Sequence, residues 1–183
     1  VVATAVAPAA APITIATLEE TTASAVGFEG CWDSTLVADP AGGAGKVGRV
    51  VKPGTGVPFY CGTTVVTVAN GGLTPVAFTS TATTMTVRVW SPDAGIPVRL
   101  KVEDIADPTK SVEAQTNTTV VGWQTLTFDF ANPAAGSASL NLATTYNKAS
   151  IFFDFGRVGT GKTYYFDDIT FVFTTSRPII HSW

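Results

Sequence analysis

Hydrophobic and polar residues alternate in short runs along most of the chain, which is the pattern of half-buried β-strands. Met85, Val87 and Val89, for example, alternate with threonines, Arg88 and Trp90. Turn-forming residues separate the runs, and the expected strands cover residues 13–18, 46–52, 63–68, 84–90, 97–103, 111–118, 123–130, 150–155 and 164–173. Since no stretch has a clear helical period, the pattern predicts an all-β fold, an antiparallel β-sandwich or jelly roll.

The same alternation assigns side chains to the two faces of each expected strand. Apolar residues on one face are expected to form the core, and the polar residues between them are expected to face solvent. The polar sets would then form one solvent-facing sheet that carries Trp90, Trp123, Arg88, Arg99 and Lys101.

Three parts of different composition are expected along the chain. Residues 1–12 are rich in alanine and proline, which is typical of an extended leader or linker arm. Residues 13–174 would form the β-sandwich domain, and residues 175–183 a polar C-terminal tail. The chain begins with Val1 rather than methionine, which indicates a processed or excerpted chain. An apolar arm of this kind can also dock on a neighbouring subunit and support self-assembly.

Composition and charge narrow the classes of function. Charged residues make up only 14% of the chain, the formal net charge is −3, and lysine and arginine form no cluster. Nucleic-acid binding needs a basic surface, so this class is excluded. No apolar run approaches the ~18 residues of a membrane-spanning helix. The strand-favouring composition is typical of a secreted or cell-surface protein.

Cys31 and Cys61 are the only cysteines. An even pair in a chain of secreted composition predicts a disulfide, and two free buried thiols are the alternative. The bridge would close a loop of about 30 residues and stabilise the fold by about 3–4 kcal/mol.

A glycine-rich segment at residues 156–163 matches the phosphate-binding loop of nucleotide-binding proteins. Such a loop presents its backbone N–H groups at the start of a helix. Tyr164, Tyr165 and Phe166 follow it here and begin a strand pattern, so nucleotide binding is not expected.

Two acidic residues, Asp167 and Asp168, interrupt the apolar closing strand. Asp167 has the parity of Ile169 and Phe171, so it would face the core with them. A buried carboxylate without a partner costs several kcal/mol, and the strand offers no neighbouring lysine or arginine. Calcium, which accepts hard oxygen ligands in a flexible geometry, would supply the missing charge. Hydrogen bonding to backbone amides at the sheet edge is the alternative.

Several segments between Val37 and Phe173 together resemble a known family. They read VADPAGGAGKVGRVVK, CGTTV, MTVRVWSPDAGIPVRLKVED, GWQTLTFDF, KASIFFDFG and KTYYFDDITF. The combination resembles the galactose-binding-like, carbohydrate-binding jelly-roll modules found beside the catalytic domains of laminarinase-like glycoside hydrolases. The resemblance implies non-catalytic binding of a polysaccharide, with a β-glucan as one such polymer.

The resemblance also implies a structural calcium that holds the first and last strands together. Glu19 and Asp167 occupy its acidic positions, Glu20 and Asp168 are reserve ligands, and carbonyls of residues 44–46 are further donors. Leu18 stands where an aromatic residue is more usual in such modules.

Candidate sugar-binding residues follow from the chemistry of a pyranose ring. Aromatic rings stack on its apolar face, and nearby polar side chains hydrogen-bond its hydroxyl groups. The residues expected to do so are Tyr60, Trp90 and Trp123, with Arg88 and Arg99 as polar partners. The alternative is that Trp90 or Trp123 only covers the sheet or packs under a loop.

A catalytic role and a structural role are the other functions that the sequence leaves open. The single histidine, His181, lies in the tail, and no E-x-D-x-x-E segment is present, so the chain is not expected to be an enzyme. A secreted sandwich with an apolar arm would also serve as a subunit of a filament, surface layer or viral shell, joined by strand pairing at an exposed edge.

Overall fold

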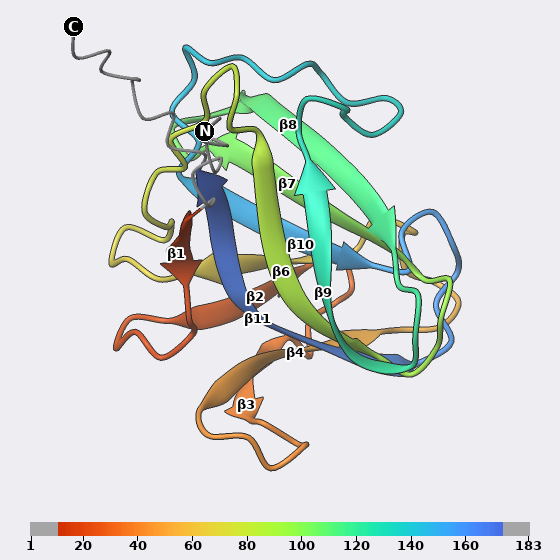
Figure 1. The fold of residues 1–183 in the computed structure, drawn as a ribbon. Coiled ribbons are helices and arrows are strands. Elements are labelled where there is room, and N and C mark those ends of the chain that lie inside the picture. The colour runs from red at the N-terminus through yellow and green to blue at the C-terminus, as the bar shows by residue number, and fades with distance from the viewer. Residues whose placement is uncertain (1–10, 174–183) are drawn as a thin grey trace, which may run out of the picture.

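Two antiparallel β-sheets stack face to face in the computed structural model, which describes residues 11–173 (Figure 1). The five-stranded sheet has the order β2 (Ser24–Phe28), β5 (Gly62–Val66), β10 (Lys148–Phe153), β7 (Pro97–Asp104), β8 (Asp107–Asn117). The six-stranded sheet has the order β3 (Thr35–Ala38), β4 (Lys46–Lys52), β11 (Lys162–Phe173), β6 (Thr84–Ser91), β9 (Gly122–Asp129), and β1 (Ala11–Ala16) also pairs with β11. The all-β sandwich predicted from the alternating pattern is therefore confirmed.

Consecutive strands hold matching positions in opposite sheets. β4 and β5, β10 and β11, and β6 and β7 each occupy the same place in the order of their respective sheets. Since neighbouring strands are antiparallel, the loops that join these pairs all lie at one end of the sandwich. We call this the crossover end.

The hydrophobic core fills the space between the sheets, and alternate residues of each strand supply it. Met85, Val87 and Val89 of β6 are fully buried, as are Phe166 and Phe171 of β11. Burying each such side chain stabilises the fold by about 1.5–3 kcal/mol.

Each of the nine expected strands is present, and residues 46–52 match β4 at both ends. β8 begins at Asp107, four residues before the expected start, and β2 and β3 were not predicted. β1 begins at Ala11, inside the expected arm, while residues 1–10 of that arm and the tail at 175–183 lie outside the described residues. Within residues 11–173, no helix is long and apolar enough to cross a membrane.

The prediction of a single polar sheet was wrong. Arg88, Trp90 and Trp123 lie on the six-stranded sheet, whereas Arg99 and Lys101 lie on β7 of the five-stranded sheet. Alternation along a strand tells which residues share its outer side, but it does not tell which sheet the strand joins.

The expected core-facing orientation of Asp167 was also wrong. Asp167 pairs across strands with Arg88, and the register then shifts before Thr170 pairs with Thr86. Asp168 occupies this bulge with a φ of 47°. The extra residue lets Phe166 and Ile169 both face the core, and it leaves Asp167 on the outer side beside Arg88.

The structure joins Cys31 to Cys61, as predicted, with their Cα atoms 5.4 Å apart. The bond ties the loop that follows β2 to the residue that precedes β5, and both cysteines are buried. The glycine-rich segment leads into β11 at Lys162, so a strand and not a helix follows it, as expected.

Candidate functional site

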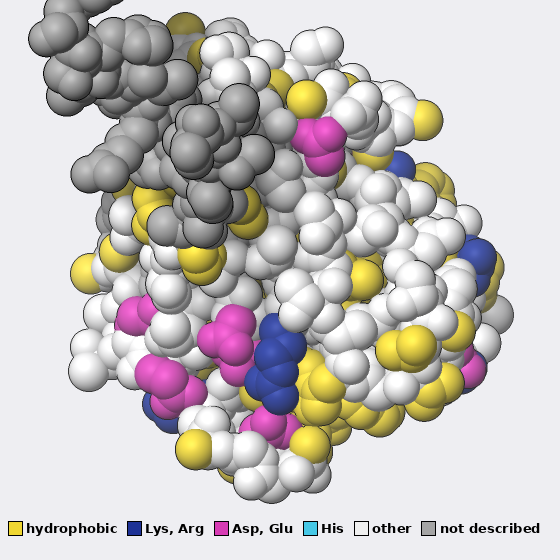
Figure 2. Space-filling view, in the orientation of Figure 1, with side chains coloured by type: hydrophobic (Ala, Val, Ile, Leu, Met, Phe, Trp, Pro, Cys, Tyr) yellow, Lys and Arg dark blue, Asp and Glu magenta, His cyan; other side chains and the backbone are white. Residues whose placement is uncertain are grey.

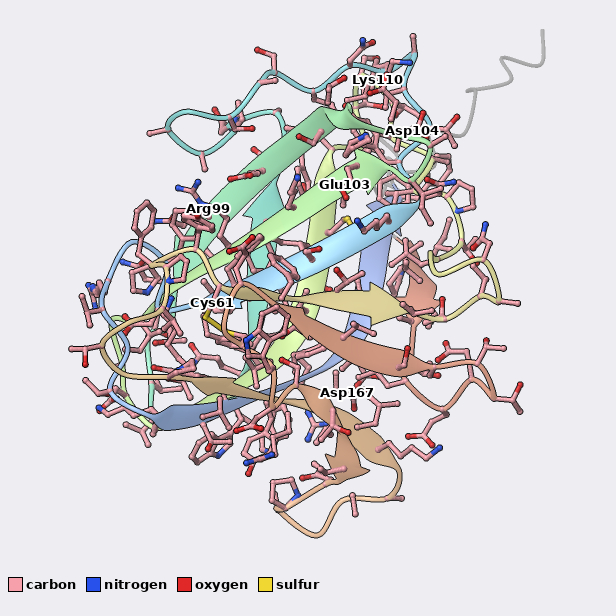
Figure 3. The ribbon with its side chains drawn as sticks, turned by 180° about the vertical axis from the view of Figure 1, so that it is seen from behind. Cys61, Arg99, Glu103, Asp104, Lys110 and Asp167 are labelled. Carbon is pink, nitrogen blue, oxygen red and sulfur yellow. A yellow bond between two sulfur atoms is a disulfide. The ribbon has the colours of Figure 1, made fainter. Side chains whose placement is uncertain are left out.

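Side chains on the outer face of the five-stranded sheet form cross-strand rows (Figure 3). One row runs from Phe28 over Gly62 to Phe152, Arg99 and Gln115. The next two rows contain Thr64, Ser150, Lys101 and Glu113, and then Lys148, Glu103 and Ser111. A cavity of about 310 Å³ opens on this face, and Phe28, Phe152, Lys101, Glu103 and Lys148 line it with smaller polar residues.

Gly62 allows two aromatic rings to meet over its strand. A Cβ atom at this position would lie 2.6 Å from the Phe152 ring and 2.7 Å from the Phe28 ring. With only hydrogen at this point, the two rings pack edge to face with their centroids 5.6 Å apart. Gly62 therefore makes the aromatic floor of the cavity possible.

The aromatic surface continues toward the crossover end. Phe155 packs edge to face on Phe152 and on Phe59, and Phe59 packs on Tyr60. The guanidinium of Arg99 lies 3.7 Å from the centroid of the Phe155 ring. Phe59 and Tyr60 are 51% and 44% exposed, so this cluster offers aromatic rings to a ligand.

The opposite side of the cavity carries charged groups with fixed positions. The Glu103 carboxylate is nearly fully buried, and it accepts from Lys101 Nζ at 2.5 Å and from Lys148 Nζ at 2.6 Å. Burial by itself raises the pKa of Glu103, but the hydrogen bonds and charges of the two lysines outweigh it and hold the pKa below the ordinary value of 4.5. Both lysines are thereby held at the cavity with part of their surface exposed.

Arg99 is fixed in a similar way at the next position of β7. Its Nη1 donates to Glu113 Oε2 at 2.7 Å, and its Nε donates to Gln115 Oε1 at 3.0 Å. The face therefore combines exposed aromatic rings with preorganised charged hydrogen-bonding groups. This pairing of groups suits a sugar, which has an apolar ring face and a rim of hydroxyl groups.

Tyr60 and Arg99 are the two predicted sugar-binding residues that the structure places at this face. Sequence reasoning missed Phe28 because β2 was not predicted. It missed Phe152 because the I-F-F segment of β10 places apolar residues on both faces of the strand, so alternation did not indicate that this ring faces outward.

The other three predicted residues, Trp90, Trp123 and Arg88, lie together on the opposite sheet. Trp123 and Trp90 form a cross-strand row on β9 and β6, and Tyr165 of β11, which was not predicted, continues it. The Arg88 guanidinium lies 3.9 Å from the centroid of the Trp123 ring.

The predicted calcium ligands lie where β1, β4 and β11 meet. Glu19 follows Leu18, which has a φ of 61°. The Oε1 atom of Glu19 accepts a hydrogen bond from the backbone N–H of Lys46 at the start of β4. Glu20 Oε1 accepts from the backbone N–H of Thr17 at 2.9 Å. Asp168 is exposed in the bulge.

Two carboxylate oxygens in this region lack partners. Glu20 Oε2 and Asp167 Oδ1 are buried without a hydrogen-bond partner among residues 11–173. Asp167 Oδ2 contacts Arg88 Nη1 at 3.3 Å, so a cation from a neighbouring strand is present where none was expected. Burial, together with the charges of Asp168 and Glu19, raises the pKa of Asp167 to about 6, against the opposing effect of Arg88. In the described part of the chain, no three histidine, cysteine or acidic side chains converge on one point as a metal cluster.

Solved structures with a similar fold include several carbohydrate-binding modules. A family 11 module from a cellulosomal cellulase of Clostridium thermocellum superposes with a TM-score of 0.58 at 14% identity, covering 90% of this chain and 96% of the module. A family 30 module of another cellulosomal cellulase of the same organism gives 0.52 at 10% identity, over 86% and 96%. A family 29 module gives 0.53 at 11% identity, over 90% and 93%.

No protein-family model and no curated protein matches the sequence. At these identities the superpositions establish the fold. This chain has the β-sandwich fold of carbohydrate-binding modules.

Proposed function

We propose that this chain is a non-catalytic carbohydrate-binding module that holds a polysaccharide on the outer face of its five-stranded sheet. The observation that carries the proposal is a chain of aromatic contacts that runs from the exposed rings of Phe59 and Tyr60 to a cavity lined by two lysines, which the Glu103 carboxylate holds in place. Such groups bind a ligand with little loss of side-chain freedom.

Each part of the face has a proposed role. Phe28, Phe59 and Tyr60 would stack on sugar rings, while Arg99 and Lys101 would donate to hydroxyl groups. Three cations and two carboxylates are present on this face, so the near balance of charge favours a neutral glycan, such as a β-glucan, over a strongly acidic one.

A binding role is also supported by the structures that share the fold, which their names describe as carbohydrate-binding modules. The disulfide between Cys31 and Cys61 supports a secreted or cell-surface setting, because such bonds persist in oxidising compartments.

A structural calcium is the second part of the proposal. The unpartnered Asp167 Oδ1 and Glu20 Oε2 fit a hard cation, with Glu19 as the further carboxylate and backbone carbonyls of residues 44–46 as additional donors. The ion would supply positive charge that offsets buried carboxylates, and it would brace the strands rather than touch the sugar.

Affinity electrophoresis tests the sugar site. Native gels containing laminarin, xylan or alginate should retard the protein in at least one case, and Tyr60→Ala and Phe28→Ala should each weaken that retardation about tenfold or more. Leu142→Ala, an exposed apolar change in the loop between β9 and β10, is the matched control and should migrate as wild type. Retardation unchanged in both aromatic variants, or absent in every gel, would exclude this face as a sugar site.

A further inference from the structure

The outer face of the six-stranded sheet carries a second set of aromatic and polar groups. Trp123, Trp90 and Tyr165 are direct cross-strand neighbours, so three rings lie side by side across β9, β6 and β11. Trp90 and Tyr165 pack edge to face with their centroids 5.6 Å apart. In Figure 2, which views this side of the molecule, hydrophobic side chains gather beside a group of basic and acidic ones.

A small cavity lies against this row. It measures about 190 Å³ and has Trp90 and Tyr165 on one side and Pro40 and Ala41, from the turn between β3 and β4, on the other. The aromatic row therefore forms one wall of a concave site, and the turn forms the other.

Asp39 fixes both walls of this cavity. Its side chain is only 3% exposed, and Oδ1 accepts from the backbone N–H of Ala41 at 2.8 Å. Its Oδ2 contacts Arg88 Nη2 at 3.5 Å, while Asp167 contacts Arg88 Nη1 at 3.3 Å. One buried carboxylate thus holds the turn and the arginine, and the arginine in turn lies over Trp123.

We infer that this surface is a second saccharide-binding site, on the side of the sandwich opposite the first. The inference takes its ligand class, a neutral glycan, from the proposed function. Asp39 and Asp167 offset the charge of Arg88, and Arg49, the cross-strand neighbour of Tyr165 on β4, is a further cation of the same row. Arg88 is still about one-third exposed, so its remaining N–H groups can donate to sugar hydroxyl groups.

Hydroxyl groups extend the surface along the sheet. Thr127, Thr86 and Thr170 form the cross-strand row two residues beyond Arg88, and Thr125 lies beside Arg88 on β9. A glycan stacked on the aromatic row would therefore meet hydroxyl donors and acceptors in the direction of the strands.

Two sites on opposite sides make the molecule bivalent. One chain would link two glycan strands, and its avidity for a polymer would exceed the affinity of either site. A protein with the first site alone would bind one glycan strand without linking it to a second.

The test uses the intact protein with Trp90→Ala, Tyr165→Ala, Phe28→Ala and the double variant Phe28→Ala/Trp90→Ala. Retardation is measured in native gels containing laminarin, xylan or hydroxyethylcellulose, and light scattering follows solutions of the same polymers after protein is added. Ile13→Ala, an exposed apolar change on β1 of the same sheet, is the control, and a thermal melt identifies any variant that fails to fold. Tyr165→Ala keeps the test valid if Trp90→Ala does not fold.

We expect Trp90→Ala and Tyr165→Ala to weaken retardation about tenfold, Phe28→Ala to leave residual retardation, and the double variant to lose it. Wild-type protein should raise the scattering of the polymer, whereas each single variant of an aromatic residue should not. The second site would be overturned, and the first would stand, if Phe28→Ala abolished retardation while Trp90→Ala and Tyr165→Ala were retarded like the wild type. Absence of retardation in every gel would overturn both. A dimer in size-exclusion chromatography that Trp90→Ala dissociates would assign the surface to a second copy of the chain and contradict the inference.

Discussion

At the scale of single residues, the candidate sugar site depends on groups whose environment fixes them in place. Gly62 lets the Phe28 and Phe152 rings meet, and Glu103 holds Lys101 and Lys148 at the edge of the cavity. The Phe28–Phe152 and Glu103–Lys148 contacts join strands that are far apart in the sequence, whereas Lys101 lies on the same strand as Glu103. A single substitution at either point would therefore change several groups of the site together.

Glu103 makes a specific contribution to stability that depends on pH. Its pKa in the folded protein lies below the ordinary value of 4.5, so its ion pairs stabilise the fold fully above that value and are lost as the pH falls through the folded pKa. We expect Glu103→Gln to lower the free energy of unfolding by about 1–3 kcal/mol at pH 7, since it removes the negative charge that pairs with two lysines and replaces one of their acceptor oxygens with a donor. Urea unfolding of both proteins at pH 7 and pH 3 measures this. The difference should shrink at pH 3, and an equal difference at both values would contradict the assignment.

The burial of single residues could be predicted from the sequence where the alternating pattern lies within one strand. The burial of Met85, Val87 and Val89 followed from alternation within β6. The orientation of Asp167 did not, because the bulge at Asp168 reverses the parity of β11 and no glycine or proline marks it. The partner of Asp167 could not be predicted either, since Arg88 lies on another strand.

At the scale of elements, the crossover end positions the exposed aromatic rings. Phe59 and Tyr60 lie in the loop between β4 and β5, and Phe155 lies in the loop between β10 and β11. Lys52 Nζ and the Gly156 N–H both donate to the Phe59 carbonyl, at 2.7 and 3.4 Å. The disulfide at Cys61 anchors the same loop from its other end.

The disulfide should therefore support both stability and binding. We expect the double variant Cys31→Ala/Cys61→Ala to lose about 3–4 kcal/mol in the free energy of unfolding, because the bridge closes a loop with a sequence separation of 30. Sugar affinity should fall as well, since Tyr60 is adjacent to Cys61. Chemical unfolding and affinity electrophoresis provide the two readouts. Two free thiols in the intact mass of the native protein, or unchanged stability of the variant, would contradict this account.

The strands themselves were easier to predict than their arrangement. Long alternating segments such as β6 and β9 were found, whereas β2 and β3 were missed because they are short and their half-buried residues show no clean alternation. The order of the strands within each sheet could not be predicted from the sequence. For that reason Arg99 was assigned to the same surface as Trp90, although the two lie on opposite sheets.

At the scale of the whole molecule, the two sheets offer separate outer surfaces and share one core. The proposed calcium would brace β11 against the segment that follows β1, and its ligand Asp167 also contacts Arg88 on the outer face of the six-stranded sheet. Since calcium would bind only the folded state, a hundredfold excess over its Kd should raise the free energy of unfolding by about 2.7 kcal/mol.

Thermal unfolding with and without a chelator checks the calcium proposal. The melting temperature should fall when calcium is removed, and Asp167→Asn should abolish that response. Asp33→Asn, an acidic change in the loop after β2, should respond as wild type. Metal-free protein that melts at the same temperature with and without added calcium would exclude the site.

Binding on the five-stranded face is the central claim, and an amide NMR titration tests it most directly. The isotope-labelled protein would be titrated in turn with laminarihexaose, xylohexaose and cellohexaose. We predict that at least one sugar shifts the amide resonances of β7, β10 and the loop that carries Tyr60, with Lys101 and Phe152 among the largest changes. Titrations in which none of the three sugars moves these resonances, while the protein remains folded, would contradict the claim.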